Sequence, residues 1–146
     1  MVYGRDTVRY NVASMELSFT RDLDRAQTIA QQIIDEDVPM KGESSAEARA
    51  RLVLGLVAME RGDSDVSLNE LTRADTLFEQ YEGSGSPWHI KGLAVLAVAQ
   101  ASAGDLAAAD ATLAAVRVLI DNVNGSATRE HQLLMAQVHV DLIAER

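Results

Sequence analysis

The sequence predicts an all-α protein built from repeated pairs of antiparallel helices, and three observations support this. Apolar residues recur three or four positions apart along the chain, which is the spacing of a helix that lies on a core. The composition is 47% hydrophobic but only 4% aromatic, with two prolines, so small and aliphatic residues dominate and helix is favoured. A short Gly-Asp turn also recurs at a nearly constant interval.

The clearest helical hairpin surrounds Gly62 and Asp63. Leu54 and Ala58 lie on one helical row before the turn, and a second apolar row follows it. Glycine adopts the left-handed conformation that often ends a helix at little cost. Asp63 or Ser64 can cap the next helix, because the side-chain oxygen of either residue can accept from N–H groups of the first turn. Gly55 lies within the first helix, so we expect another helix to come close there.

The turn at Gly62-Asp63 has a counterpart on each side. Gly104-Asp105 follows it by forty-two residues, and Arg21-Asp22 precedes it by forty-one. Small residues stand at matching distances from each turn. They are Ser14, Gly55 and Ala97 seven positions before, and Ala26, Ser67 and Ala109 five positions after. The agreement predicts three repeats, at about 6–41, 44–84 and 87–125, and a closing helix at about 127–145, in a single domain over 1–146.

Seven helices are expected from this pattern. Pro39 and Gly42 are predicted to end the second, and the acidic run at 35–37 is interpreted as its solvated end. Trp88 is expected to fill the gap between the fourth and fifth helices, with an anchor for a partner as the alternative. The expected ranges are about 6–20, 23–37, 45–61, 64–81, 88–103, 106–123 and 127–145.

These features resemble the tetratricopeptide repeat family over residues 6–146. The residues that carry the resemblance are Leu54-Gly55, Ala58, Gly62-Asp63, Leu71 and Ala74 in the middle repeat, Leu96-Ala97, Gly104-Asp105, Ala109 and Leu113 in the third, and Tyr10, Ala13-Ser14, Leu17, Asp22 and Ala26 in the first. Arg51, Ala58 and Ser67 depart from the usual Trp, Tyr and Ala. The period of forty-two rather than about thirty-four is similar to the longer repeats of kinesin light chains and bacterial maltose-activator-type regulators. The resemblance implies a right-handed superhelix of helix pairs, an α-solenoid.

Composition narrows the class of function. The net charge is −9, from 22 acidic and 13 basic residues, which argues against direct binding of nucleic acid. The chain has no cysteine, which excludes disulfides and thiolate metal sites and fits a cytoplasmic protein. No apolar run is long enough to span a membrane, and no signal peptide is expected.

No arrangement of residues indicates catalysis. His131 and His139 are eight positions apart, too far along a helix to bind one metal ion, and no acidic residue completes a ligand set. We therefore expect no catalytic residue, no metal and no cofactor. An enzyme is the least favoured of the three functions considered.

The resemblance implies that the first helix of each pair lines a concave face that binds a partner. The residues on that face would be Asn11, Met15, Arg49, Leu52, Leu56, Met59, Lys91, Ala94 and Val98. Leu52 and Leu56 occupy positions where carboxylate-clamping members have polar residues, so that activity is not expected. The expected function is a protein–protein interaction scaffold that binds a peptide or helix in an apolar trough. The alternative is that these residues only pack against neighbouring helices.

The helix at 127–145 is apolar on two sides, which requires cover on two sides. One stripe comprises Leu134, Met135, Val138 and Leu142, and the other Leu133, Ala136, Val140 and Ile143. A capping helix, a continued array in a longer chain and a homodimer all remain open. Leu133, Val140 and Ile143 are the residues assigned to an oligomer interface. The alternative function is thus a self-assembling or sensor fragment of a larger signalling or transcription regulator.

Overall fold

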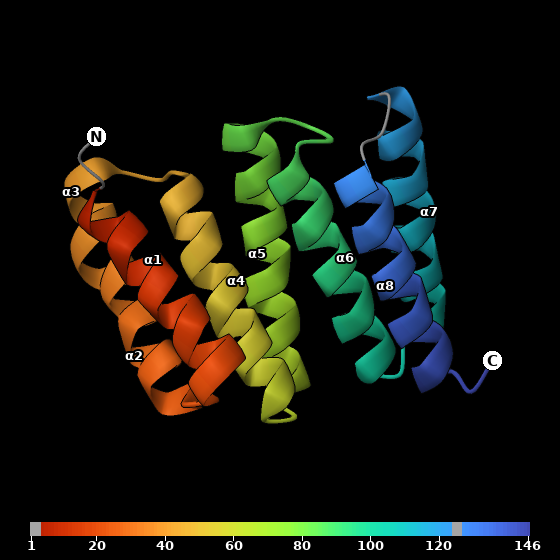
Figure 1. The fold of residues 1–146 in the computed structure, drawn as a ribbon, viewed down its shortest axis with the longest axis horizontal. Coiled ribbons are helices and arrows are strands. Elements are labelled where there is room, and N and C mark those ends of the chain that lie inside the picture. Colours follow the sequence, from red (N-terminus) through yellow and green to blue (C-terminus); the bar gives the residue numbers. More distant parts are fainter. Residues whose placement is uncertain (1–3, 124–126) are drawn as a thin grey trace. The chain divides into compact units, whose positions relative to one another are not determined.

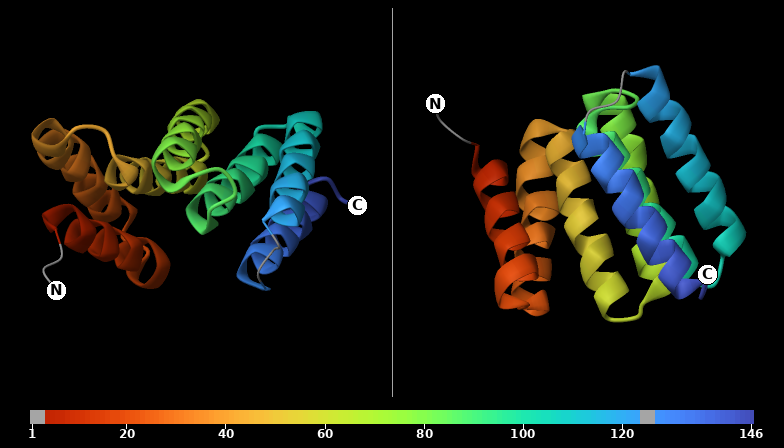
Figure 2. Two further views of the ribbon diagram at one scale, coloured as in Figure 1. Left: turned by 90° about the horizontal axis from the view of Figure 1, so that it is seen from above. Right: turned by 45° about the vertical axis from the view of Figure 1, so that its right-hand side comes forward.

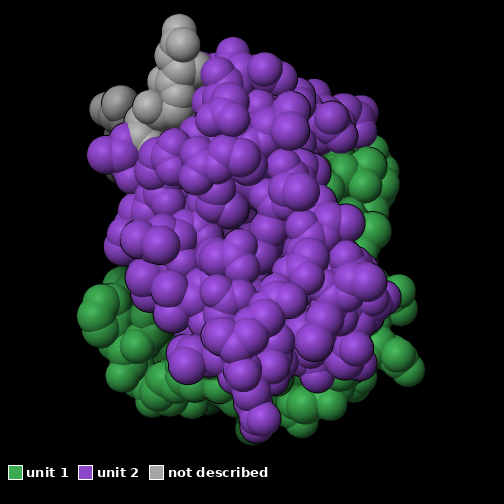
Figure 3. Space-filling model, turned by 90° about the vertical axis from the view of Figure 1, so that its right-hand side faces the viewer, with its two compact units in different colours: residues 1–77 green, residues 78–146 purple. Residues whose placement is uncertain are grey.

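Helices account for all regular structure in the residues that can be described. The computed structural model describes residues 4–123 and 127–146, and no strand occurs in these ranges (Figure 1). When helical segments that continue into one another are taken together, this part of the chain has seven helices, which confirms the predicted all-α class. The solenoid arrangement stays a prediction. The chain divides into two compact units, residues 1–77 and 78–146 (Figure 3). The boundary between them lies inside the helix α5.

Unit 1 consists of α1, α2, α4 and most of α5. Its helices are α1 (Arg5–Met15), which continues through a π-helical segment (Glu16–Thr20), α2 (Leu23–Gln32), which continues through a second π-helical segment (Ile33–Asp37) into α3 (Val38–Lys41), α4 (Ser45–Glu60) and α5 (Ser64–Glu82). The helices α1 and α2 pack on each other, and both contact α4. Their shared core comprises Ala13, Leu17, Ala26, Ala30, Ile33, Ala50, Val53, Leu54 and Val57.

The second helix runs further than the sequence predicts. Instead of stopping near Asp37, the chain continues into α3, which carries Pro39 in its first turn and ends at Gly42 with φ +81°. The N–H of Val38 bonds to the carbonyl of Ile33, five residues back, which is the wider spacing of a π-helix. Proline lacks an N–H but is tolerated in the first turn of a helical segment. The helix therefore passes Pro39 in a new first turn instead of ending there.

The three predicted turns share one local structure. Arg21, Gly62 and Gly104 all have positive φ, at 59°, 76° and 91°. The aspartate that follows each of them caps the next helix. Asp22 accepts from the Arg25 N–H at 3.0 Å, Asp63 from the Val66 N–H at 3.3 Å and Asp105 from the Ala108 N–H at 3.0 Å. The spacing of the turns predicts that Arg21 is equivalent to the two glycines, and its left-handed backbone conformation confirms this.

The close approach expected at Gly55 occurs between α4 and α5. A Cβ added to Gly55 would lie 2.5 Å from side-chain carbons of Leu71. Ser67 of α5 is buried, and its hydroxyl donates to the Gly55 carbonyl at 3.0 Å. Ser67 stands where tetratricopeptide repeats usually have alanine. Its buried hydroxyl is satisfied by this hydrogen bond, which joins the two helices.

Unit 2 consists of the end of α5 with α6 (Pro87–Ser102), α7 (Leu106–Asn122) and α8 (Ala127–Ile143). The helix α7 runs antiparallel to α6 and α8, and α8 packs on both (Figure 2). The core of this unit comprises Ile90, Ala94, Ala97, Ala101, Ala109, Leu113, Val116, Ile120, Leu133, Ala136 and Val140. Among the described residues, no helix combines the length and apolar character needed to cross a membrane.

The left-handed turns lead to a stability prediction. Gly104→Ala should lower the free energy of unfolding by about 1–2 kcal/mol, because a side chain is disfavoured in the left-handed conformation. No atom lies within 4 Å of the added Cβ, so the effect would be conformational and not a clash. Arg21→Gly in the equivalent turn should not lower stability, since it removes the same strain and loses only an exposed ion pair with Glu60 and a long hydrogen bond to the Leu17 carbonyl at 3.4 Å. Urea denaturation of both variants tests this, and equal losses would contradict it.

Candidate interaction surfaces

In unit 1, burial separates the predicted trough residues on α4 into two kinds. Leu52 is buried, so no partner can reach it without rearrangement. Arg49, Leu56 and Met59 are only partly buried, and Leu56 packs against the core of the unit. The cause is that α4 packs on several sides at once, and only a narrow strip of its surface stays open.

The neighbouring helix α1 contributes the other accessible residues. Asn11 and Met15 are exposed, and α1 contacts α4. The guanidinium of Arg49 lies 5.6 Å from the centre of the Tyr10 ring, a cation–π contact that joins the two helices. Burial raises the pKa of Tyr10, consistent with a packed ring. We define the α1–α4 face as Asn11, Met15, Arg49, Leu56 and Met59.

The predicted trough residues on α6 belong mainly to the interior of unit 2. Ala94 is buried in the core, and Val98 packs against it. Lys91 is partly buried, with its ammonium 5.2 Å from the centre of the Trp88 ring. Trp88 in turn stacks on the buried Phe78 of α5 at 5.5 Å between ring centres. Trp88 therefore fills the gap between α5 and α6, as expected.

Two of the three residues assigned to an oligomer interface are core residues. Leu133 and Val140 are buried against α6 and α7, and only Ile143 is exposed. The other stripe of α8, comprising Leu134, Met135, Val138 and Leu142, faces outward. The sequence indicates two stripes but does not say which one packs inward. Contact with a second chain stays a prediction, and it would have to use the outward stripe.

Surface hollows lie elsewhere than the predicted trough. One of about 750 Å³ lies between α7 and α8, with Ala114, Arg117 and Leu134 among its lining residues. Another of about 370 Å³ lies on unit 1, lined by residues of α2, α4 and α5. Neither hollow is lined by a residue of the α1–α4 face.

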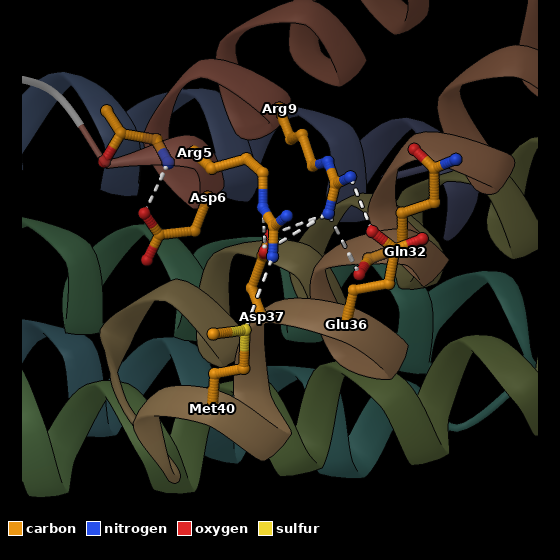
Figure 4. A network of polar contacts seen from close by, with 8 residues as sticks. Arg5, Asp6, Arg9, Gln32, Glu36, Asp37 and Met40 are labelled. Atoms are coloured by element: carbon orange, nitrogen blue, oxygen red, sulfur yellow. Dashed lines mark hydrogen bonds and ion pairs between the residues drawn. The ribbon is translucent and has the colours of Figure 1, made fainter.

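A polar network that the sequence analysis missed ties α1 to the end of α2 (Figure 4). Asp37 is buried, and its carboxylate accepts from Arg5 at 2.7 Å and from Arg9 at 3.1 Å. Arg9 also pairs with the exposed Glu36 at 2.7 Å. The interpretation of 35–37 as a solvated end is therefore wrong for Asp37. Arg5 and Arg9, four residues apart on one helix, could have indicated that an acidic residue pairs with them. Because two arginines hold Asp37, we assign the network a structural role.

Histidines and acidic residues do not gather into a ligand set. Within residues 4–123 and 127–146, no group of three or more His, Asp or Glu side chains could hold a metal ion. His131 and His139 are exposed on α8, whereas the buried His89 accepts from the Gly85 N–H at 3.0 Å.

Comparison of the chain with protein-family models, with curated proteins and with solved structures finds no match in any of the three. The resemblance to tetratricopeptide repeats therefore rests on the residues and turns described above, and membership of that family stays a prediction.

Lys91 leads to a prediction about the pH dependence of stability. Burial lowers the pKa of Lys91 from its ordinary value of 10.5, so the folded chain binds fewer protons than the unfolded chain just below that pH. The contribution of Lys91 to the free energy of unfolding should therefore increase as the pH rises toward 10.5. Lys91→Met removes this gain. Urea denaturation at several pH values should show the parent improving relative to the variant with rising pH, and a constant difference would contradict the assignment.

Proposed function

We propose that this chain is a non-enzymatic protein–protein interaction scaffold that binds an amphipathic helix or peptide of a partner protein. The observation that carries the proposal is the α1–α4 face. The helices α1 and α4 contact each other, Met15 of α1 is exposed, and Leu56 and Met59 of α4 are partly open, so both helices present apolar surface. The apolar face of an amphipathic helix is a common ligand of apolar surface between neighbouring helices.

Charge indicates the chemistry of the partner. The net charge of −9 would attract a basic segment and repel an acidic one. The partner segment we propose is therefore a helix with leucine-like residues on one side and lysine or arginine on the other. The absence of cysteine suits a reducing compartment such as the cytoplasm. Lys91, Ala94 and Val98 are not part of this binding surface.

A synthetic amphipathic helix of leucine and lysine serves as the probe, and its leucine and glutamate counterpart is the charge control. The parent chain should bind the lysine peptide more tightly, and added salt should weaken binding. The double variant Leu56→Gln, Met59→Gln should lose about tenfold in affinity or more, because two apolar contacts are removed. Glutamine keeps the helical propensity and approximate size of both side chains.

Fluorescence anisotropy measures the affinities, and circular dichroism checks that helix content is unchanged. The matched control is Val66→Gln, an exposed position on α5 outside the α1–α4 face. If the double variant bound as tightly as the parent, or if the control variant lost as much affinity as the double variant, the α1–α4 face would not be the binding surface.

A further inference from the structure

The helix α8 presents an apolar stripe that the core of unit 2 does not use. The exposed fractions are 60% for Leu134, 43% for Met135, 43% for Val138 and 71% for Leu142. We call these four residues the α8 stripe. The opposite side of the helix already supplies Leu133, Ala136 and Val140 to the core. Covering the stripe therefore requires a surface other than this core.

Electrostatics allows two copies of this acidic chain to meet at the stripe. None of its four residues is charged. The acidic residues beside it are paired within unit 2, since Glu130 accepts from Arg117 at 2.8 Å and Asp141 accepts from Arg146 at 3.1 Å. The hydrogen bond from Arg117 also lowers the pKa of Glu130. Repulsion expected from a net charge of −9 is thus reduced along this part of the surface.

Three of the four residues of the α8 stripe are also placed symmetrically about Val138. Leu134 stands four residues before it and Leu142 four residues after, whereas the position that mirrors Met135 is Asp141, whose carboxylate pairs with Arg146. When two helices cross in antiparallel orientation about a two-fold axis at one residue, positions equally far on either side of it face each other. Leu134 then faces Leu142 of the second copy, and Val138 faces itself. Met135 faces Asp141 of the second copy, so no like charges meet at these positions.

We propose that α8 pairs antiparallel with α8 of a second copy of this chain, with the two-fold axis at Val138. The hollow of about 750 Å³ between α7 and α8 lies beside Leu134, so it has room for side chains of the second copy. The mode of contact is isologous, with the same surface on both copies.

The size of the contact sets its strength. The 17 residues of α8 make a helix about 25 Å long. A pair of such helices buries less than the roughly 1,200 Å² at which stable interfaces begin. The dimer should therefore be reversible and visible as a rise in mass with concentration. This proposal goes beyond the binding function above and does not rest on it, because the α1–α4 face contributes nothing to the dimer.

Sedimentation equilibrium over a concentration series tests the proposal. The parent should change from monomer to dimer, and Val138→Glu should shift the midpoint at least tenfold higher in concentration, because two carboxylates would face each other at the axis. Val118→Glu is the matched control, since Val118 is 58% exposed on α7 and lies outside the stripe. It should leave the midpoint unchanged. A parent that stays monomeric throughout, or equal shifts in both variants, would overturn the proposal.

Single cysteines test the register, because the chain contains none of its own. Under mild oxidation Val138→Cys should link to itself rapidly, because it faces itself across the axis at a distance a disulfide can span. Leu134→Cys should link slowly alone but rapidly when mixed with Leu142→Cys. Val118→Cys is the control, and its linkage at the rate of Val138→Cys would overturn the proposal even if Val138→Glu failed to fold.

Discussion

Three helical hairpins, α1–α2, α4–α5 and α6–α7, depend on a left-handed residue followed by a capping aspartate. Arg21, Gly62 and Gly104 reverse the chain, and the aspartate after each satisfies an N–H of the next helix. The reversal fixes which positions meet across the hairpin. Seven residues before the turn and five after it come together, as the hydrogen bond from Ser67 to the Gly55 carbonyl shows. This is why both positions are small in all three repeats, and why the helices approach closely without large core side chains.

Local features of this fold could be predicted from the sequence, because local chemistry determines them. Glycine, aspartate and the small residues constrain the backbone where they stand, so the turns and most helix ends followed from spacing. Pro39 was misjudged because its effect depends on the preceding π-helical turn, which leaves no mark in the sequence. Asp37 was misjudged because its burial depends on Arg5 and Arg9, some thirty residues away.

The candidate surfaces were harder to predict, because exposure is a property of packing. Leu52 and Ala94 have the residue types of a trough but are buried. Both stripes of α8 are apolar, and its tertiary contacts with α6 and α7 determine which one is buried. The inward stripe has a small residue, Ala136, at its centre, which permits close approach to α6. The outward stripe has only larger side chains. Such a difference in size is a signal that sequence analysis could use.

Apolar side chains are open to a partner on the α1–α4 face of unit 1 and on the α8 stripe of unit 2. The acidic charge favours a basic partner at the first, and the paired charges beside the second permit self-association. Hydrogen–deuterium exchange over about a hundredfold range of protein concentration tests this separation of roles most directly, because association slows exchange only where local opening is suppressed. We predict slower exchange at high concentration in peptides covering 131–143 and no change in those covering 45–60. Exchange that is independent of concentration in α8, or that slows equally in both regions, would contradict the account.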